Sequence, residues 1–180
     1  MKKILVIVDV QNDFVTGSLG SKEAEGIIPK VLDLIVKGDY DVSYTTLDTH
    51  DADYAETHEG KMLPVRHCLY LTQGWLPEKR VLEALEAIPR PNYVVTKPTF
   101  GSFALLSKTK EFLDEAGDKD LCIDICGLCT DICVINNALM LRAAYPQADI
   151  FVIADACAGT TPEMHQKALD VMKSCQIEVI

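Results

Sequence analysis

The sequence predicts an α/β fold with three α/β/α layers around a mainly parallel, six-stranded, Rossmann-like sheet. Short apolar runs rich in β-branched residues alternate with amphipathic stretches of about ten to fifteen residues, the pattern of successive βαβ units. Several of these runs are apolar throughout, as strands are when helices cover both faces of a parallel sheet. The chain has 180 residues, of which 48% are hydrophobic, so we expect a single domain over residues 1–180 with one core.

The first half of the chain begins with an apolar run at Ile4–Val8, which predicts a buried strand that ends before Asp9. A glycine-containing loop follows. Apolar residues at helical spacing then predict a helix at 27–37 that covers the sheet. A second strand, at 41–47, leads directly to Asp48.

The second half repeats the alternation of helices and strands. A helix at 77–88 precedes a strand at 93–96, which ends at Lys97, and Ser102 is expected to cap a helix that runs to 113. The same patterns predict the remaining elements: a buried strand at 121–126 that ends at Gly127, a helix that runs to about Ala144, a strand at 150–153 with an exit loop at 155–159, a helix from Pro162 capped by Thr161, and an edge strand at 176–180.

Charged residues follow three of the predicted strands, and a cysteine follows a fourth. They are Asp9, Asp48 and Lys97, each directly after a strand, and Cys133 near the start of a helix. Because the carboxyl ends of parallel strands meet at one edge, we expect these residues to surround one crevice. Asp9 either caps the following loop or acts as a general acid or base. Lys97 either extends to the surface or forms an ion pair with a thiolate.

Cys133 is the last of four closely spaced cysteines, after Cys122, Cys126 and Cys129. The spacing could suit a metal or an iron–sulfur cluster, but it matches no common zinc pattern, and the turn at Gly127 would point the first two away from the others. We therefore expect Cys122 and Cys126 to be small core residues. Near a helix start, unpaired amides and the positive end of the dipole favour an anion, so the Cys133 thiol is expected to lose its proton readily and act as a nucleophile.

The long irregular stretch after the second strand holds three of the chain's four histidines. Asp48 and His50 are two residues apart, so in an extended backbone their side chains point the same way and can contact one ion. His67 can join them, and His58 and Glu59 compete for a fourth position. Two imidazoles and a carboxylate suit one divalent ion, with zinc, iron and manganese as alternatives.

Charge and cysteine content limit the expected partners and compartment. The formal net charge of −10 argues against nucleic acid and anionic membranes as partners. The first apolar run is too short for a signal peptide, and no stretch approaches the length of a transmembrane helix. Seven cysteines, an odd number, suggest free thiols in a reducing cytoplasm. The fourth histidine, His165, is expected to be structural or at the surface, and a homo-oligomer is compatible with the sequence.

Three motifs together resemble the isochorismatase-like cysteine hydrolases, and within that family the nicotinamidases. The motifs are V-D-V-Q-N-D-F at 8–14, K-P-T-F-G-S-F at 97–103 and G-L-C-T-D-I-C-V at 127–134. The D-T-H segment at 48–50, followed by L-P-V-R-H-C at 63–68, resembles a metal-binding segment typical of nicotinamidases. The resemblance covers essentially the whole chain.

The resemblance implies a catalytic triad of Asp9, Lys97 and Cys133. It also implies a cis peptide bond between Leu128 and Cys129. In this family, the backbone amides at the positions of Cys129 and Cys133 form the oxyanion hole, which binds the negative oxygen that develops when a carbonyl is attacked.

The resemblance further implies that Asp48, His50 and His67 hold the metal, with Glu59 ranked above His58 as a further contact. A second group of residues is expected to contact the substrate: Phe14, Leu63 and Leu128. The family often has Trp or Phe where this chain has Leu63, and Trp75 lies too far along the chain to be assigned to that position.

From these residues we expect the hydrolysis of nicotinamide to nicotinic acid and ammonia through a thioester on Cys133. One alternative is the same chemistry on another small amide, or on a carbamoyl or ureido compound. A second alternative is a non-catalytic protein that uses its clustered thiols for redox sensing or metal storage. That alternative leaves Asp9 and Lys97 without a role.

Overall fold

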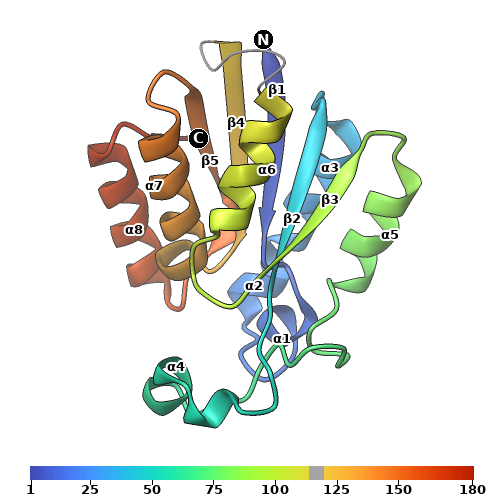
Figure 1. Ribbon diagram of the computed structural model, residues 1–180, viewed down its shortest axis with the longest axis vertical. Helices are drawn as coiled ribbons and strands as arrows, with labels where there is room; N and C mark the ends of the chain where they lie inside the picture. Colours follow the sequence, from blue (N-terminus) through green and yellow to red (C-terminus); the bar gives the residue numbers. More distant parts are fainter. Residues whose placement is uncertain (114–119) are drawn as a thin grey trace.

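Six parallel strands form the sheet of the computed structural model, which describes residues 1–113 and 120–180 (Figure 1). Their order across the sheet is β3-β2-β1-β4-β5-β6. The strands are β1 (Lys2–Val8), β2 (Val42–Asp48), β3 (Asn92–Lys97), β4 (Leu121–Leu128), β5 (Asp149–Ala158) and β6 (Glu178–Val179). Every pairing is parallel, so the predicted α/β fold and six-stranded sheet are confirmed.

Helices pack on both faces of the sheet and complete the three layers. In Figure 1, α6 (Phe103–Leu113) and α7 (Ile135–Ala144) lie in front of the sheet beside α8 (Pro162–Ser174), and α3 (Ile28–Lys37) and α5 (Lys79–Ala87) lie behind it. The shorter elements are α1 (Asn12–Val15), α2 (Lys22–Gly26), the 3-10 helix η1 (Tyr54–Glu56), α4 (His58–Met62) and the π-helix η3 (Thr130–Val134). In the described part of the chain, no helix combines the length and the apolar character needed to cross a membrane.

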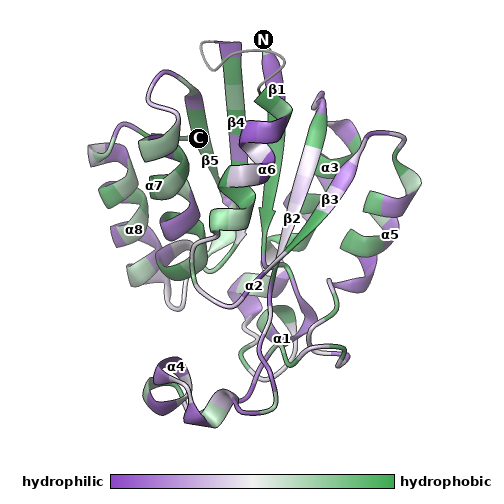
Figure 2. Cartoon of the chain, viewed as in Figure 1, coloured by the Kyte–Doolittle hydropathy of each residue, from purple (hydrophilic) through white to green (hydrophobic). Residues whose placement is uncertain are grey.

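The centre of the sheet is β1, whose residues Ile4–Val8 have no exposed surface. Complete burial of one large aliphatic side chain contributes about 1.5–3 kcal/mol, so this run anchors the core. β1 pairs with β2 on one side and β4 on the other, and Figure 2 shows β1 and much of β4 as hydrophobic. The carboxyl ends of these three strands are therefore neighbours at one edge of the sheet.

β4 extends beyond the strand that the sequence predicts at 121–126. The turn expected at Gly127 is absent, because Gly127 pairs with Val8 of β1 and the strand ends at Leu128. The φ angle of Gly127 is +117°, and a Cβ atom there would collide with the backbone of Val8. Glycine at this position lets β4 pass close to β1.

Other boundaries also differ from those expected. β5 runs to Ala158, so most of the loop expected at 155–159 is strand, whereas β6 is shorter than the strand expected at 176–180. Two short helices, α1 and α2, flank the glycine-containing loop. The expected caps are confirmed, since the hydroxyls of Ser102 and Thr161 accept hydrogen bonds from the first turns of α6 and α8.

The segment between β2 and α5 is fastened to the residues that follow β1. The buried Gln11 side chain donates to the Asp48 carbonyl at 2.9 Å and accepts from the Asp48 N–H at 2.7 Å. The Asp13 carboxylate accepts from the Cys68 N–H at 2.8 Å. These side chains satisfy backbone groups at the end of β2 and at Cys68, and so they hold the irregular segment in a defined position.

Candidate active site

The carboxyl edge of the sheet brings together Asp9, Lys97 and Cys133, which we call the Lys97 cluster. Lys97 is the last residue of β3, and its Nζ lies 2.6 Å from Asp9 Oδ2 and 3.5 Å from Cys133 Sγ. The same Nζ lies 3.4 Å from Oδ1 of Asp48, the last residue of β2. All four side chains are buried. Polar residues at or after the ends of four strands thus surround one point, with Lys97 at its centre.

Lys97 remains charged because two carboxylates contact it. Burial by itself lowers the pKa of a lysine, but Asp9, the Cys133 sulfur and Asp48 outweigh burial and raise the pKa of Lys97. Burial also raises the pKa of Asp9, and Asp48 raises it further, while Lys97 opposes them. Asp9 is therefore a stronger base than a solvent-exposed aspartate and is suited to accept a proton.

Cys133 lies in η3, which continues directly into α7. Burial raises the pKa of its thiol well above the ordinary value, Asp9 raises it further, and Lys97 lowers it. This differs from the expectation that the helix start makes the thiol more acidic. The helix dipole is worth only about 0.3–1 kcal/mol at such a position, less than the effect of complete burial. Cys133 needs a base, and Asp9 is the carboxylate that shares the Lys97 ammonium with the thiol.

Thr46 orients the Asp9 carboxylate. Its Oγ1 donates to Asp9 Oδ1 at 2.7 Å, and the backbone N–H of Asp9 lies 3.1 Å from the Thr46 carbonyl. The φ angle of Asp9 is +49°, a left-handed conformation that few residues other than glycine adopt. The threonine contacts hold Asp9 in this conformation, with its second oxygen toward Lys97.

The clustered cysteines do not form a metal site. All seven cysteines are free, Cys126 is buried in the core and Cys122 is partly exposed. Within residues 1–113 and 120–180, the one group of metal-binding side chains whose ligand atoms converge contains no cysteine. The peptide bond between Leu128 and Cys129 is cis, as the resemblance implied.

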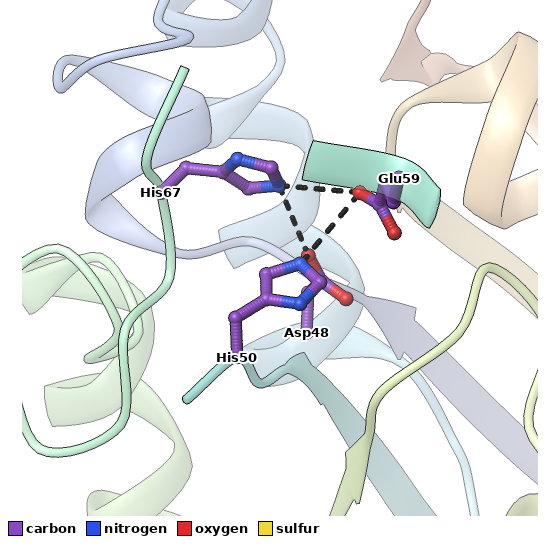
Figure 3. Close-up of side chains that lie close together, drawn as sticks. All are labelled: Asp48, His50, Glu59 and His67. Carbon is purple, nitrogen blue, oxygen red and sulfur yellow. Dashed lines mark hydrogen bonds and ion pairs between the residues drawn. The ribbon is translucent and has the colours of Figure 1, made fainter. Parts of the chain in front are cut away.

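That converging group consists of Asp48, His50, Glu59 and His67, which we call the histidine cluster (Figure 3). One ligand atom from each residue lies within 4.8 Å of the others. Asp48 Oδ2 is 2.9 Å from His50 Nε2 and 3.4 Å from His67 Nε2. Glu59 Oε1 is 3.7 Å from both imidazole nitrogens, and the four side chains point toward one another.

The surrounding residues orient these ligands. The Nδ1 of His67 lies 2.8 Å from the Val65 carbonyl, which can only accept a hydrogen bond, so Nδ1 carries a hydrogen and Nε2 faces the cluster. The Tyr54 ring packs against both imidazoles, with centroids 4.6 Å from His50 and 5.1 Å from His67. The Tyr54 hydroxyl donates to the Leu63 carbonyl at 2.9 Å.

α4 directs Glu59, and not His58, into the cluster. The Thr57 hydroxyl caps this helix by accepting from the Gly60 N–H at 2.9 Å. A Cβ atom on Gly60 would collide with the backbone of Tyr54, so glycine allows α4 to pack on η1. Glu59 then faces inward, while the adjacent His58 is exposed.

The donor chemistry of the histidine cluster fits a divalent cation. Burial raises the pKa of Asp48, but hydrogen bonds from His50 and His67 outweigh burial and hold it below the ordinary value. Burial and the nearby Asp48 charge raise the pKa of Glu59, while His50, His67 and Lys97 oppose them. Two carboxylate oxygens and two imidazole nitrogens match the ligands that zinc, iron and manganese accept.

A model of the isochorismatase domain matches residues 3–180. The chain belongs to the isochorismatase domain family. The resemblance of the three sequence motifs to this family is therefore confirmed. The isochorismatase domain covers both the Lys97 cluster and the histidine cluster.

Similar proteins narrow the activity within the family. A nicotinamidase of Schizosaccharomyces pombe is 28% identical over 98% of this chain and 91% of its own length. A nicotinamidase/pyrazinamidase structure from Bacillus subtilis has a TM-score of 0.80 at 29% identity, with 99% of each chain covered. A pyrazinamidase of Pyrococcus horikoshii, solved in complex with zinc, has a TM-score of 0.76 at 26% identity over 100% of this chain and 99% of its own. The chain is an amidohydrolase.

The residues expected to contact substrate lie in different settings. Phe14 is 9% exposed, and its ring centroid is 5.4 Å from that of His67, while Leu63 is 36% exposed. The side chain of Leu128 is buried in the core. Trp75, which the sequence left unassigned, donates from Nε1 to the Thr49 hydroxyl. His165 is bonded to the Thr130 hydroxyl at 2.7 Å, in agreement with a structural role.

Sequence reasoning missed three residues that support the two clusters. They are Gln11, Thr46 and Tyr54. The sequence could have indicated Thr46, because a polar residue in a strand buried on both faces needs a hydrogen-bond partner. Gln11, which follows Asp9 and Val10 after β1, is also a polar residue close to a buried strand, but its partner, Asp48, could be known only from the fold.

Proposed function

We propose that the protein hydrolyses nicotinamide to nicotinic acid and ammonia through a thioester on Cys133. One observation carries the proposal: a single buried ammonium, Lys97 Nζ, contacts Asp9, Cys133 and Asp48. The candidate proton acceptor Asp9, the Cys133 thiol and the Asp48 carboxylate of the histidine cluster therefore contact the same ammonium. A redox sensor or a metal store needs no such arrangement.

In the proposed reaction, Asp9 accepts the Cys133 proton, and the thiolate attacks the carboxamide carbon. The backbone amides of Cys129 and Cys133 stabilise the oxyanion, a contribution of about 3–4 kcal/mol per donor in other hydrolases. Asp9 then donates its proton to the leaving nitrogen, and ammonia departs as the C–N bond breaks. Asp9 next removes a proton from water, which attacks the thioester and regenerates the thiol. Lys97 stabilises the charges that form on Asp9 and Cys133.

The residues that would hold the metal are Asp48, His50, His67 and Glu59. A divalent ion held by these residues, zinc with iron and manganese as alternatives, would supply Lewis acidity for the pyridine nitrogen. Phe14, whose ring packs against His67, and Leu63 would contact the ring of the substrate. The contact between Lys97 and Asp48 would link the positions of the ring and of the reacting carbonyl.

A second candidate is the same reaction on another small amide, or on a carbamoyl or ureido compound. The observation that favours it is Leu63, which cannot stack on a pyridine ring as an aromatic side chain does. A flexible, partly exposed aliphatic residue accepts a wider range of ligand shapes. This candidate keeps the roles of the Lys97 cluster and changes only the ligand.

Ammonia release from nicotinamide by the purified protein tests the proposal. The assay is run on protein as prepared, after chelation, and after chelation followed by zinc, iron or manganese. Release that falls on chelation and returns with one of these ions supports a metal-assisted nicotinamidase. If a metal-loaded protein releases no ammonia from nicotinamide but releases it from other small amides, the second candidate replaces the first.

A further inference from the structure

Asn137 connects the segments that carry Lys97 and Cys133. It lies in α7 and is 1% exposed. Its side chain donates to the carbonyl of Cys133 at 2.8 Å and to the carbonyl of Phe100 at 3.2 Å. It also accepts from the backbone N–H of Ser102 at 3.0 Å. One side chain thus binds the backbone of Cys133 and both ends of the turn at 100–102.

The partners leave only one orientation for the Asn137 amide. The Ser102 N–H can only donate, so the amide oxygen must face it, and the two carbonyls can only accept, so the NH2 group must face them. Both amide hydrogens are used. No other residue type of similar size offers one acceptor and two donors in this plane, since aspartate lacks the donors and leucine lacks all three groups.

The sheet alone does not set the distance between Lys97 and Cys133. Lys97 ends β3 and Cys133 follows β4, and two strands, β2 and β1, lie between them. Small shifts in the position of each strand relative to its neighbour add up across the pairings between β3 and β4. The turn after Lys97 instead lies directly against α7, where a Cβ atom on Gly101 would collide with Met140. Asn137 forms hydrogen bonds across this contact.

We propose that Asn137 is a positioning residue that holds Cys133 within reach of Lys97. By fixing the Cys133 carbonyl to the 100–102 turn, it fixes the sulfur relative to the ammonium, which lies 3.5 Å away. The inference rests on the proposed function in one respect, the role of Cys133 as nucleophile. It does not depend on which amide is the substrate.

The test compares Asn137→Ala and Asn137→Ser with a matched control, Asn136→Ala. The serine hydroxyl keeps a donor for the Cys133 carbonyl within the helix but is too short to reach the turn. Asn136 makes the same kind of bond one position earlier, donating to the Ile132 carbonyl at 2.8 Å, and it has no bond to the turn. The control therefore loses a bond within the helix and leaves the connection to the turn intact.

Two rates are measured on folded, metal-loaded protein. The first is the rate of alkylation of Cys133 by iodoacetamide, with Cys133→Ala as background, and the second is kcat and KM for nicotinamide. Both Asn137 variants should lower the alkylation rate and kcat by about tenfold or more, since a misplacement of about 1 Å can cost on the order of 100-fold. KM and metal content should stay within about twofold of wild type, and Asn136→Ala should match wild type.

An Asn137 variant that melts at a lower temperature but is alkylated at the wild-type rate overturns the inference and leaves the proposed function intact. An equal loss of rate in Asn136→Ala also overturns it, because the effect then belongs to bonds within the helix. If Cys133 of the wild-type protein is not alkylated and nicotinamide is not cleaved, the proposed function itself fails. If Cys133 is alkylated but nicotinamide is not cleaved, only nicotinamide is excluded as the substrate. The alkylation rates of the Asn137 variants then decide the role of Asn137.

Discussion

The Lys97 cluster and the histidine cluster meet at the contact between Lys97 and Asp48, yet they are built differently. The Lys97 cluster comes from residues at or just after the ends of regular strands, and its side chains are almost completely buried. Apart from Asp48, the histidine cluster comes from an irregular segment, and the Glu59 side chain is 20% exposed. The ends of the strands, with the Asn137 contacts between α7 and the 100–102 turn, position the first cluster, whereas side chains from the segment after β1 hold the second. Substitutions in one cluster should therefore change its own chemistry and leave that of the other cluster near wild type.

The largest expected effect is that of Cys133→Ala. Turnover should fall by at least about a thousandfold, because loss of the nucleophile in other triad hydrolases costs on the order of 10⁶ in kcat. Metal content, measured by elemental analysis, should equal that of wild type, since Cys133 does not belong to the histidine cluster. Retained turnover would contradict the thioester mechanism and the assignment of the nucleophile to the Lys97 cluster.

The reciprocal change is His50→Ala. It removes a ligand atom from the histidine cluster, and metal affinity should fall at least about 100-fold, because loss of a residue that merely supports a ligand costs about 10–100-fold. Alkylation of Cys133 by iodoacetamide should continue at a rate near that of wild type. His58→Ala is the matched control, since His58 is exposed and should leave metal binding unchanged. Equal metal loss in the two variants would show that the geometry of α4 is misassigned.

Thr46→Val tests the role of Asp9 in the Lys97 cluster through the pH dependence of kcat/KM. Asp9 acts as a base only when ionised, and burial raises its pKa, so the acid limb of kcat/KM should lie above the pH expected for an exposed aspartate. The Thr46 hydroxyl bonds to the ionised form and lowers that pKa. Its removal should therefore move the acid limb to higher pH, with metal content unchanged. A shift to lower pH would contradict the assignment of Asp9 as the base.

The smallest expected effect is that of Asn12→Ala. The Asn12 amide donates to the Gln73 carbonyl at 2.8 Å, near the far end of the irregular segment and at an exposed position. Its loss should lower the free energy of unfolding by about 1 kcal/mol or less. Gln11→Leu, which leaves two buried backbone groups of Asp48 without partners, should cost more and should weaken metal binding. Urea denaturation of both variants with and without metal checks this order.

The sequence was most informative where one local pattern decided the outcome. Local patterns located all six strands, and the residues after the first three strands located Asp9, Asp48 and Lys97 at one edge. Boundaries were less accurate where pairing across the sheet decided them. Gly127 looked like a turn from sequence but is part of β4, because its neighbours in β1 and β5 supply hydrogen-bonding partners that no local pattern reveals.

The sequence by itself determined the α/β fold, the family motifs, and the residue types available for acid–base, thiol and metal chemistry. The tertiary structure decided three things: that Lys97 contacts Asp9 across the sheet, that Glu59 and not its neighbour His58 joins the histidines, and that burial raises the pKa of the Cys133 thiol. The physical reason is the range of the interactions involved. Periodicity and capping act within a few residues, whereas strand order, helix packing and burial join residues far apart in the chain, and these set the distances and pKa values on which the chemistry depends.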